Sequence, residues 1–85
     1  TLTSLTSLNL SHNLFAEVPP LEQCIDLQSL NLSFNKITDV TVIQSRIGGV
    51  SKLSLQGNKL VSTVGLQFLM GLSHLDLRDN MITDW

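Results

Sequence analysis

Few side chains in this sequence have the chemical types and spacing that catalysis or metal binding requires. The two histidines, His12 and His74, lie in different copies of a repeat, roughly 13–14 Å or more apart if one strand per copy is spaced at about 4.8 Å. The single cysteine, Cys24, falls on an apolar position of that repeat and is expected to be buried rather than reactive. No serine lies in a G-x-S-x-G motif, and no glycine spacing matches a phosphate-binding loop. We therefore expect no catalytic residue, no cofactor and no metal site.

Composition and charge exclude further classes of partner. The 85 residues are 42% hydrophobic and 14% charged, with a net charge of -2, which argues against disorder. Lysine and arginine form no run, so the sequence predicts no binding to nucleic acid or to an anionic membrane. The unbroken apolar runs are far too short to span a membrane. One thiol cannot form a disulfide within the chain, which fits a reducing compartment.

A sequence word, L-x-x-L-x-L-x-x-N, recurs along the whole chain. Its four copies occupy residues 5–13, 27–35, 50–58 and 72–80. Each copy ends on an asparagine, and these are Asn13, Asn35, Asn58 and Asn80. With three further apolar positions around each word, 23 of 24 apolar positions are filled, and Thr63 is the exception. Such a regular repeat predicts a solenoid in which each copy buries its apolar face against its neighbours.

The L-x-L step in each word predicts a short strand, because residues two apart project to the same face. Successive strands are expected to pair in parallel and to stack their leucines into one core. Each asparagine stands where the chain leaves the strand, where its side chain can bond backbone groups that the turn leaves unpaired. Between the words, Leu21, Cys24 and Leu27 step by three, which suits 3₁₀ turns. Ile43 and Ile47 step by four, which suits an α turn.

The words resemble those of the leucine-rich repeat family. The resemblance implies an α/β solenoid, a right-handed superhelix with a short parallel β-sheet on its concave face and 3₁₀ or short helical turns on its convex face. The 22-residue spacing is similar to the intracellular subclass typified by the protein-phosphatase-1 regulatory subunit, and the later copies look like nischarin-type scaffolds. Residues 1–85 are then expected to be one segment of four repeats, a fragment of a longer solenoid that lacks polar capping repeats.

The resemblance also implies a function, that of a protein–protein interaction scaffold in signalling or trafficking, cytoplasmic or endosome-associated, and not an enzyme. Its partner is expected to be another protein and not a small-molecule substrate. Two alternatives stay open. One is a structural spacer within a larger protein. The other is a bacterial internalin-type extracellular adhesin, for which glycan analysis of the formal sequons at Asn9 and Asn31 is one test.

Strand alternation predicts which side chains form the concave binding face. The candidates are Asn9, His12, Asn31, Phe34, Lys52, Ser54, Gln56, His74, Asp76, Arg78 and Asp79. Phe34 is the one large apolar residue among these candidates. Aromatic side chains are enriched among the residues that dominate binding energy. Charge gathers in the fourth copy, which predicts a specificity rim around that aromatic anchor.

Overall fold

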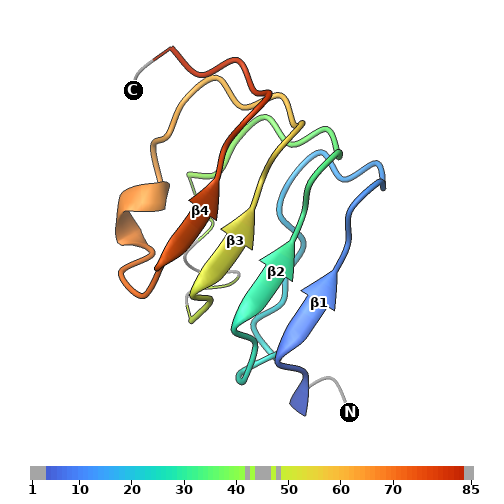
Figure 1. The fold of residues 1–85 in the computed structure, drawn as a ribbon, viewed down its shortest axis with the longest axis vertical. Helices are drawn as coiled ribbons and strands as arrows, with labels where there is room; N and C mark the ends of the chain where they lie inside the picture. The colour runs from blue at the N-terminus through green and yellow to red at the C-terminus, as the bar shows by residue number, and fades with distance from the viewer. Residues whose placement is uncertain (1–3, 42, 44–46, 48, 84–85) are drawn as a thin grey trace.

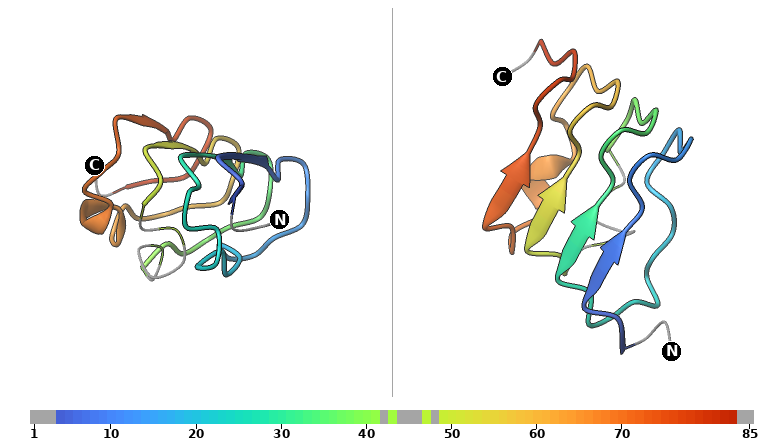
Figure 2. Two further views of the ribbon diagram at one scale, coloured as in Figure 1. Left: turned by 90° about the horizontal axis from the view of Figure 1, so that it is seen from below. Right: turned by 45° about the vertical axis from the view of Figure 1, so that its right-hand side comes forward.

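The chain winds as a coil that contributes one strand to a sheet in every turn. A computed structural model describes residues 4–41, 43, 47 and 49–83. Its strands are β1 (Ser7–Asn9), β2 (Ser29–Asn31), β3 (Lys52–Ser54) and β4 (His74–Asp76). They form one parallel sheet in the order β1-β2-β3-β4, with the return segments behind it (Figure 1). Figure 2 shows that each return segment runs back beneath the sheet before it enters the next strand.

The register of the sheet confirms the predicted strand phase. Leu30 pairs with Leu8 on one side and with Leu53 on the other, and Leu53 pairs with Leu75. The outward-facing residues on either side of these leucines are also in register. One column contains Ser7, Ser29, Lys52 and His74, and the other contains Asn9, Asn31, Ser54 and Asp76. Residues that are about 22 positions apart in sequence are therefore neighbours in space.

The stacked leucines form the core, and burial is greatest in the two middle repeats. The L-x-L leucines there, Leu30, Leu32, Leu53 and Leu55, are at most 3% exposed. Complete burial of such a side chain stabilises a fold by about 1.5–3 kcal/mol. The outer strands have a neighbour on one side only, so Leu8 is half-buried and Leu75 is 42% exposed. Cys24 is buried in the same core, as its apolar position predicts.

The predicted asparagine ladder is present and joins each repeat to the preceding one. The side-chain amide of Asn58 donates to the carbonyl of Leu55 in its own repeat and to that of Leu32 in the preceding repeat, each at 3.0 Å. Its carbonyl oxygen accepts the backbone N–H of Ile37 at 3.1 Å. Asn35 and Asn80 repeat this arrangement. The turn after each strand is thereby locked to the neighbouring repeat.

Helix contributes less to the described residues than an α/β class implies. The step of three in the first return segment coincides with hydrogen bonds from Cys24 N to Leu21 O and from Leu27 N to Cys24 O. In the third return segment, η2 (Leu66–Phe68) is a 3₁₀ helix. The α turn predicted between Ile43 and Ile47 includes residues 44–46, which lie outside the described residues, although both isoleucines are buried.

Candidate functional site

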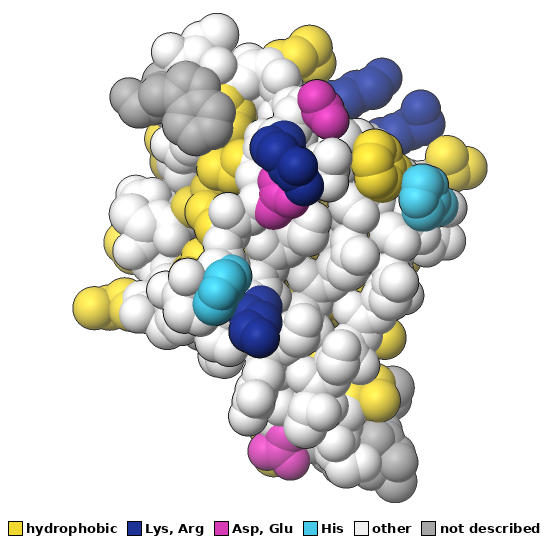
Figure 3. All heavy atoms as spheres, in the orientation of Figure 1, with side chains coloured by type: hydrophobic (Ala, Val, Ile, Leu, Met, Phe, Trp, Pro, Cys, Tyr) yellow, Lys and Arg dark blue, Asp and Glu magenta, His cyan; other side chains and the backbone are white. Residues whose placement is uncertain are grey.

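The sheet presents its outward side chains on one surface, which continues onto the turns that follow the strands. We call this surface the strand face. It consists of the exposed and half-buried side chains of residues 7–14, 29–36, 52–59 and 74–81. All eleven candidate residues belong to it, and each is exposed or half-buried. Figure 3 looks onto this surface and shows small uncharged side chains over β1 and β2, and charged side chains mainly over β3 and β4. The predicted contrast between neutral first repeats and a charged fourth repeat is therefore visible on the folded molecule.

A hollow over β2, β3 and β4 brings most of the candidates together. Seven of the eleven line it: Asn31, Lys52, Ser54, His74, Asp76, Arg78 and Asp79. Lys52 makes no ion pair with any described residue, so its ammonium group is available to a ligand. The His74 ring lies 2.9 Å from the Ser73 hydroxyl, measured from Nδ1 to Oγ. The other four candidates, Asn9, His12, Phe34 and Gln56, lie outside the lining of this hollow.

The charged side chains of the fourth repeat are bonded to one another. The guanidinium of Arg78 contacts the Asp76 carboxylate at 2.8 Å and also donates to Gln56 Oε1 at 3.4 Å. The amide of Gln56 in turn donates to the Asp79 carboxylate at 3.3 Å. The bonds from Arg78 lower the pKa of Asp76, and the Asp76 carboxylate raises the pKa of Arg78. The predicted rim is therefore a bonded network in which Arg78 and Asp76 neutralise each other and Asp79 keeps its negative charge.

Carboxamide or carboxylate groups at the ends of the strands also bond their own chain. The side-chain oxygen of Asn31 accepts the backbone N–H of Ser33 at 2.9 Å and the Ser33 hydroxyl at 2.5 Å. Asn9 makes the equivalent bonds to Ser11. Asp76 likewise accepts the backbone N–H of its second neighbour. Sequence reasoning assigned Asn9 and Asn31 to partner binding, and the structure shows that their carbonyl oxygens stabilise the turn that follows.

One row of turn residues has a backbone conformation that sequence reasoning did not anticipate. The φ angles of His12, Phe34 and Asp79 are 59°, 58° and 59°, and that of Gly57 is 72°. This left-handed region is uncommon for side chains other than glycine and costs roughly 1–2 kcal/mol per residue. The signal available in the sequence was Gly57, which marks the row in one repeat. At Phe34 the strained turn is held by the hydrogen bonds of the neighbouring Asn35.

Phe34 is fixed between its neighbours in this row. Its ring stacks on the His12 ring with centroids 4.8 Å apart and an angle of 14° between the planes. On its other side the ring occupies the space of an absent side chain, because a Cβ added to Gly57 would collide with two of its ring carbons. The phenylalanine nevertheless remains 43% exposed. Phe34 is therefore an apolar side chain held between two neighbours at the surface, and its exposure agrees with its expected place on the outward face.

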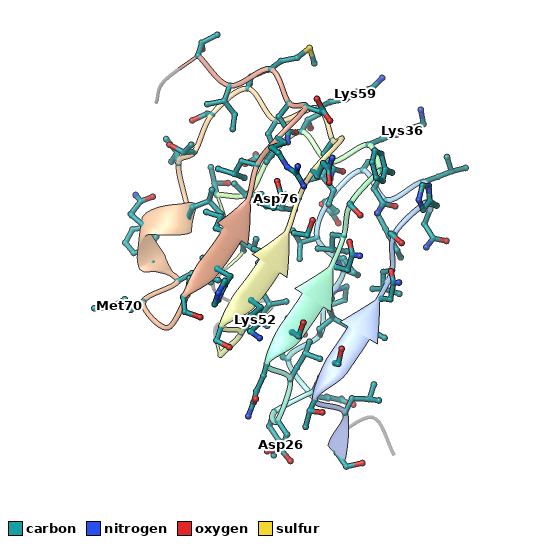
Figure 4. The ribbon with its side chains drawn as sticks, in the orientation of Figure 1. Asp26, Lys36, Lys52, Lys59, Met70 and Asp76 are labelled. Atoms are coloured by element: carbon teal, nitrogen blue, oxygen red, sulfur yellow. The ribbon has the colours of Figure 1, made fainter. Side chains whose placement is uncertain are left out.

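A second row of exposed residues lies beside the first and was missing from the candidates. It consists of the residues that directly follow the four asparagines: Leu14, Lys36, Lys59 and Met81. Figure 4 shows Lys36 and Lys59 extending from the end of the sheet at which the strands terminate. Neither lysine makes an ion pair with a described residue. The signal was present in the sequence, because aligning the asparagines also aligns these residues.

Within the described part of the chain, no cluster of three or more histidine, cysteine, aspartate or glutamate side chains could hold a metal ion. None of the helices in that part is both long enough and apolar enough to cross a membrane.

Comparison with known proteins identifies the repeat. A family model described as leucine-rich repeats in two copies matches residues 3–45, about half of the chain. An uncharacterized leucine-rich repeat-containing protein of Schizosaccharomyces pombe is 44% identical over 85 residues, which cover 98% of this chain and 14% of that protein.

Two human proteins are also similar. The serine/threonine-protein kinase 11-interacting protein is 35% identical over 82 residues, which cover 95% of this chain. The leucine-rich repeats and immunoglobulin-like domains protein 1 is 38% identical over 82 residues, which cover 92% of this chain. The chain spans 8% of the length of each human protein. The similarity therefore concerns a repeat segment shared by much longer polypeptides.

Proposed function

Because the chain belongs to the leucine-rich repeat family, we propose that it is an interaction scaffold that binds another protein through its strand face. Domains of this family generally mediate protein–protein interaction, and the family is typically not enzymatic. One relative is named for its interaction with serine/threonine-protein kinase 11. The observation that carries the proposal is the Phe34 ring, which is ordered by His12 and Gly57 and yet 43% exposed.

The proposed site has an apolar anchor and a polar surround. Phe34 and His12 form the anchor, because a rigid aromatic side chain gives contact area with little loss of conformational entropy. The hollow lined by Lys52 and His74 lies next to it on the same face. The network of Arg78, Asp76 and their neighbours forms the rim, which sets orientation and association rate more than affinity. The remaining candidates, Asn9 and Asn31, support the turns of the first two repeats.

We also propose that the coil is right-handed, that it resembles the protein-phosphatase-1 regulatory subunit, and that it has a nischarin-type role in signalling or trafficking. A cytoplasmic or endosome-associated location belongs with these proposals. The 22- to 23-residue period and the parallel sheet support the likeness to this subclass.

Site-specific photocrosslinking in cells tests the function. A photoreactive amino acid is placed at Lys52 on the strand face or at Glu22 on an exposed return segment. We expect protein adducts from position 52 and few from position 22, and we expect Phe34→Ala to reduce the adducts from position 52. Adducts confined to position 22 would place the partner on the convex side. If neither position gave adducts, the segment would be a structural spacer.

A further inference from the structure

Charge is distributed unevenly between the two sides of the molecule. All four described lysine and arginine residues lie on the strand face, and they are Lys36, Lys52, Lys59 and Arg78. Four of the six described aspartate and glutamate residues lie on the return segments, and they are Glu17, Glu22, Asp26 and Asp39. One of the two acidic groups on the strand face, Asp76, is neutralised by Arg78. The chain is acidic as a whole, yet its strand face carries an excess of positive charge.

The free positive charge is concentrated beside the aromatic anchor. Lys36 follows Phe34 by two residues, and Lys59 follows Gly57 by two, so the lysines flank the place where the Phe34 ring packs on Gly57. Figure 4 shows both lysines at the end of the sheet opposite to Asp26. The turns that carry them are neighbours, because the N–H of Phe34 bonds the carbonyl of Gln56 at 2.7 Å. We call the row of Leu14, Lys36, Lys59 and Met81 the lysine row, and we call the region that joins it to His12, Phe34 and Gly57 the turn edge.

The lysine row is apolar at its two ends. Leu14 is 78% exposed and Met81 is 56% exposed, and the lysines lie between them. Lys36 and Lys59 occupy equivalent positions of adjacent repeats, whose backbones are spaced at about 4.8 Å in the sheet. Their like charges repel each other, and a bound carboxylate between them would relieve that repulsion. A segment crossing the repeats would place its acidic groups over Lys36 and Lys59 and its apolar groups against Phe34 and Leu14 or Met81.

We propose that the turn edge binds an acidic segment of a partner protein, one that carries glutamates or aspartates beside a bulky hydrophobic side chain. This inference rests on the proposed function and adds the chemistry of the partner. Charge complementarity selects the acidic residues, and the exposed Phe34 ring selects the hydrophobic one. An anionic membrane is a weaker fit, because polybasic membrane sites use clusters of about 4–8 lysines and arginines and the turn edge has two.

The test measures peptide binding to the full natural polypeptide by fluorescence anisotropy. The probe is a labelled peptide with a leucine–phenylalanine pair flanked by glutamates, and its control has glutamine in place of every glutamate. We expect the glutamate peptide to bind at least about tenfold more tightly, with an advantage that shrinks as salt shortens the electrostatic range. The double variant Lys36→Glu/Lys59→Glu should abolish this advantage.

Matched variants separate the turn edge from general electrostatics. Gln23→Glu adds a negative charge at an exposed position on a return segment and should change binding of the glutamate peptide by less than about threefold. Gly57→Ala displaces the Phe34 ring without altering any charge and should weaken both peptides. A Lys36→Arg/Lys59→Arg variant keeps the charge and should bind as the unchanged protein does.

The outcomes distinguish the inference from the proposed function. Equal binding of the two peptides, or no effect of the double charge reversal, would overturn the acidic partner while leaving the strand face as a protein-binding surface. Absence of binding by either peptide would also overturn it, and adducts from position 52 would then still support the function. Binding to phosphatidylserine vesicles that the double reversal abolishes, without binding of the glutamate peptide, would identify a membrane instead.

Discussion

Asn58 joins two repeats through a single side chain, since its amide lies 3.0 Å from the carbonyl oxygens of both Leu32 and Leu55. The three residues are buried, so these carbonyl groups have no access to water that could replace the amide. A buried polar group left without a partner costs about 1–3 kcal/mol. The asparagine that ends an interior word therefore contributes to stability on the same scale as the leucines that precede it.

Replacement of Asn58 by alanine should lower the free energy of unfolding by about 1–3 kcal/mol, because it leaves the buried N–H of Ile37 without its partner. The carbonyls of Leu32 and Leu55 each lose one of two amide donors and keep the other. Urea denaturation of the chain fused to terminal capping repeats measures this change. Asn13→Ala is the matched control, because Asn13 is exposed and, among the described residues, bonds the carbonyls of Leu10 and Ser11 in its own repeat. Equal losses for the two variants would contradict a role for Asn58 in joining repeats.

Replacement of Leu55 tests the packing of the core, again by urea denaturation. Its side chain is fully buried in an interior repeat, so Leu55→Ala should cost about 2–5 kcal/mol of unfolding free energy. Leu75→Ala, at a leucine that is 42% exposed on the outermost strand, should cost about 1 kcal/mol or less. A loss below about 1 kcal/mol at Leu55 would be incompatible with the strand phase in which its side chain faces the core.

The ion pair between Asp76 and Arg78 predicts a pH dependence. Bonds from Arg78 lower the pKa of Asp76 below its ordinary value of 3.8, so the pair stabilises the fold above that value and the contribution is lost as the pH falls through the lowered pKa. Arg78 is exposed and Asp76 is half-buried at the surface, so the effect should be small and sensitive to salt. We compare the urea-denaturation midpoints of the unchanged protein and of Arg78→Gln. Their difference should be constant from neutral pH to mildly acidic pH and should vanish in stronger acid. A difference between these midpoints that grew as the pH fell would contradict the prediction.

The core could be predicted from the sequence because it repeats. Aligning Asn13, Asn35, Asn58 and Asn80 places every leucine of the sheet, and the observed register confirms that placement. Local spacing also indicated the short turns around Cys24, where the chain bonds at steps of three. Each of these features depends on contacts between equivalent residues of neighbouring repeats, which the period alone determines.

The surface was harder to predict because it depends on pairs of residues that are not equivalent. The position of the Phe34 ring depends on His12 in the preceding repeat and on a glycine in the following one, because the ring stacks on the histidine and occupies the space of an absent side chain at Gly57. The pairing of Arg78 with Asp76 was similarly hidden, since a strand places both on one face but does not specify whether they bond each other or a ligand. Lys36 and Lys59 were missed because strand alternation predicts exposure only as far as the residue before each asparagine, and both lysines follow an asparagine.

The anchor on the strand face gives the most direct functional prediction. Phe34→Ala removes an aromatic group that is held in place before a partner arrives, and it should weaken binding of the crosslinked partner by about 1–3 kcal/mol. The unfolding free energy should change less than for Leu55→Ala, because the ring is 43% exposed and lies outside the core. His12→Ala, which leaves Phe34 in place but frees one side of its ring, should have a smaller effect of the same sign. Titration calorimetry with the identified partner measures these changes, and Glu22→Ala, at an exposed site on a return segment, is the control that should leave affinity unchanged. If Glu22→Ala weakened binding and Phe34→Ala did not, the partner would bind the convex side of the solenoid.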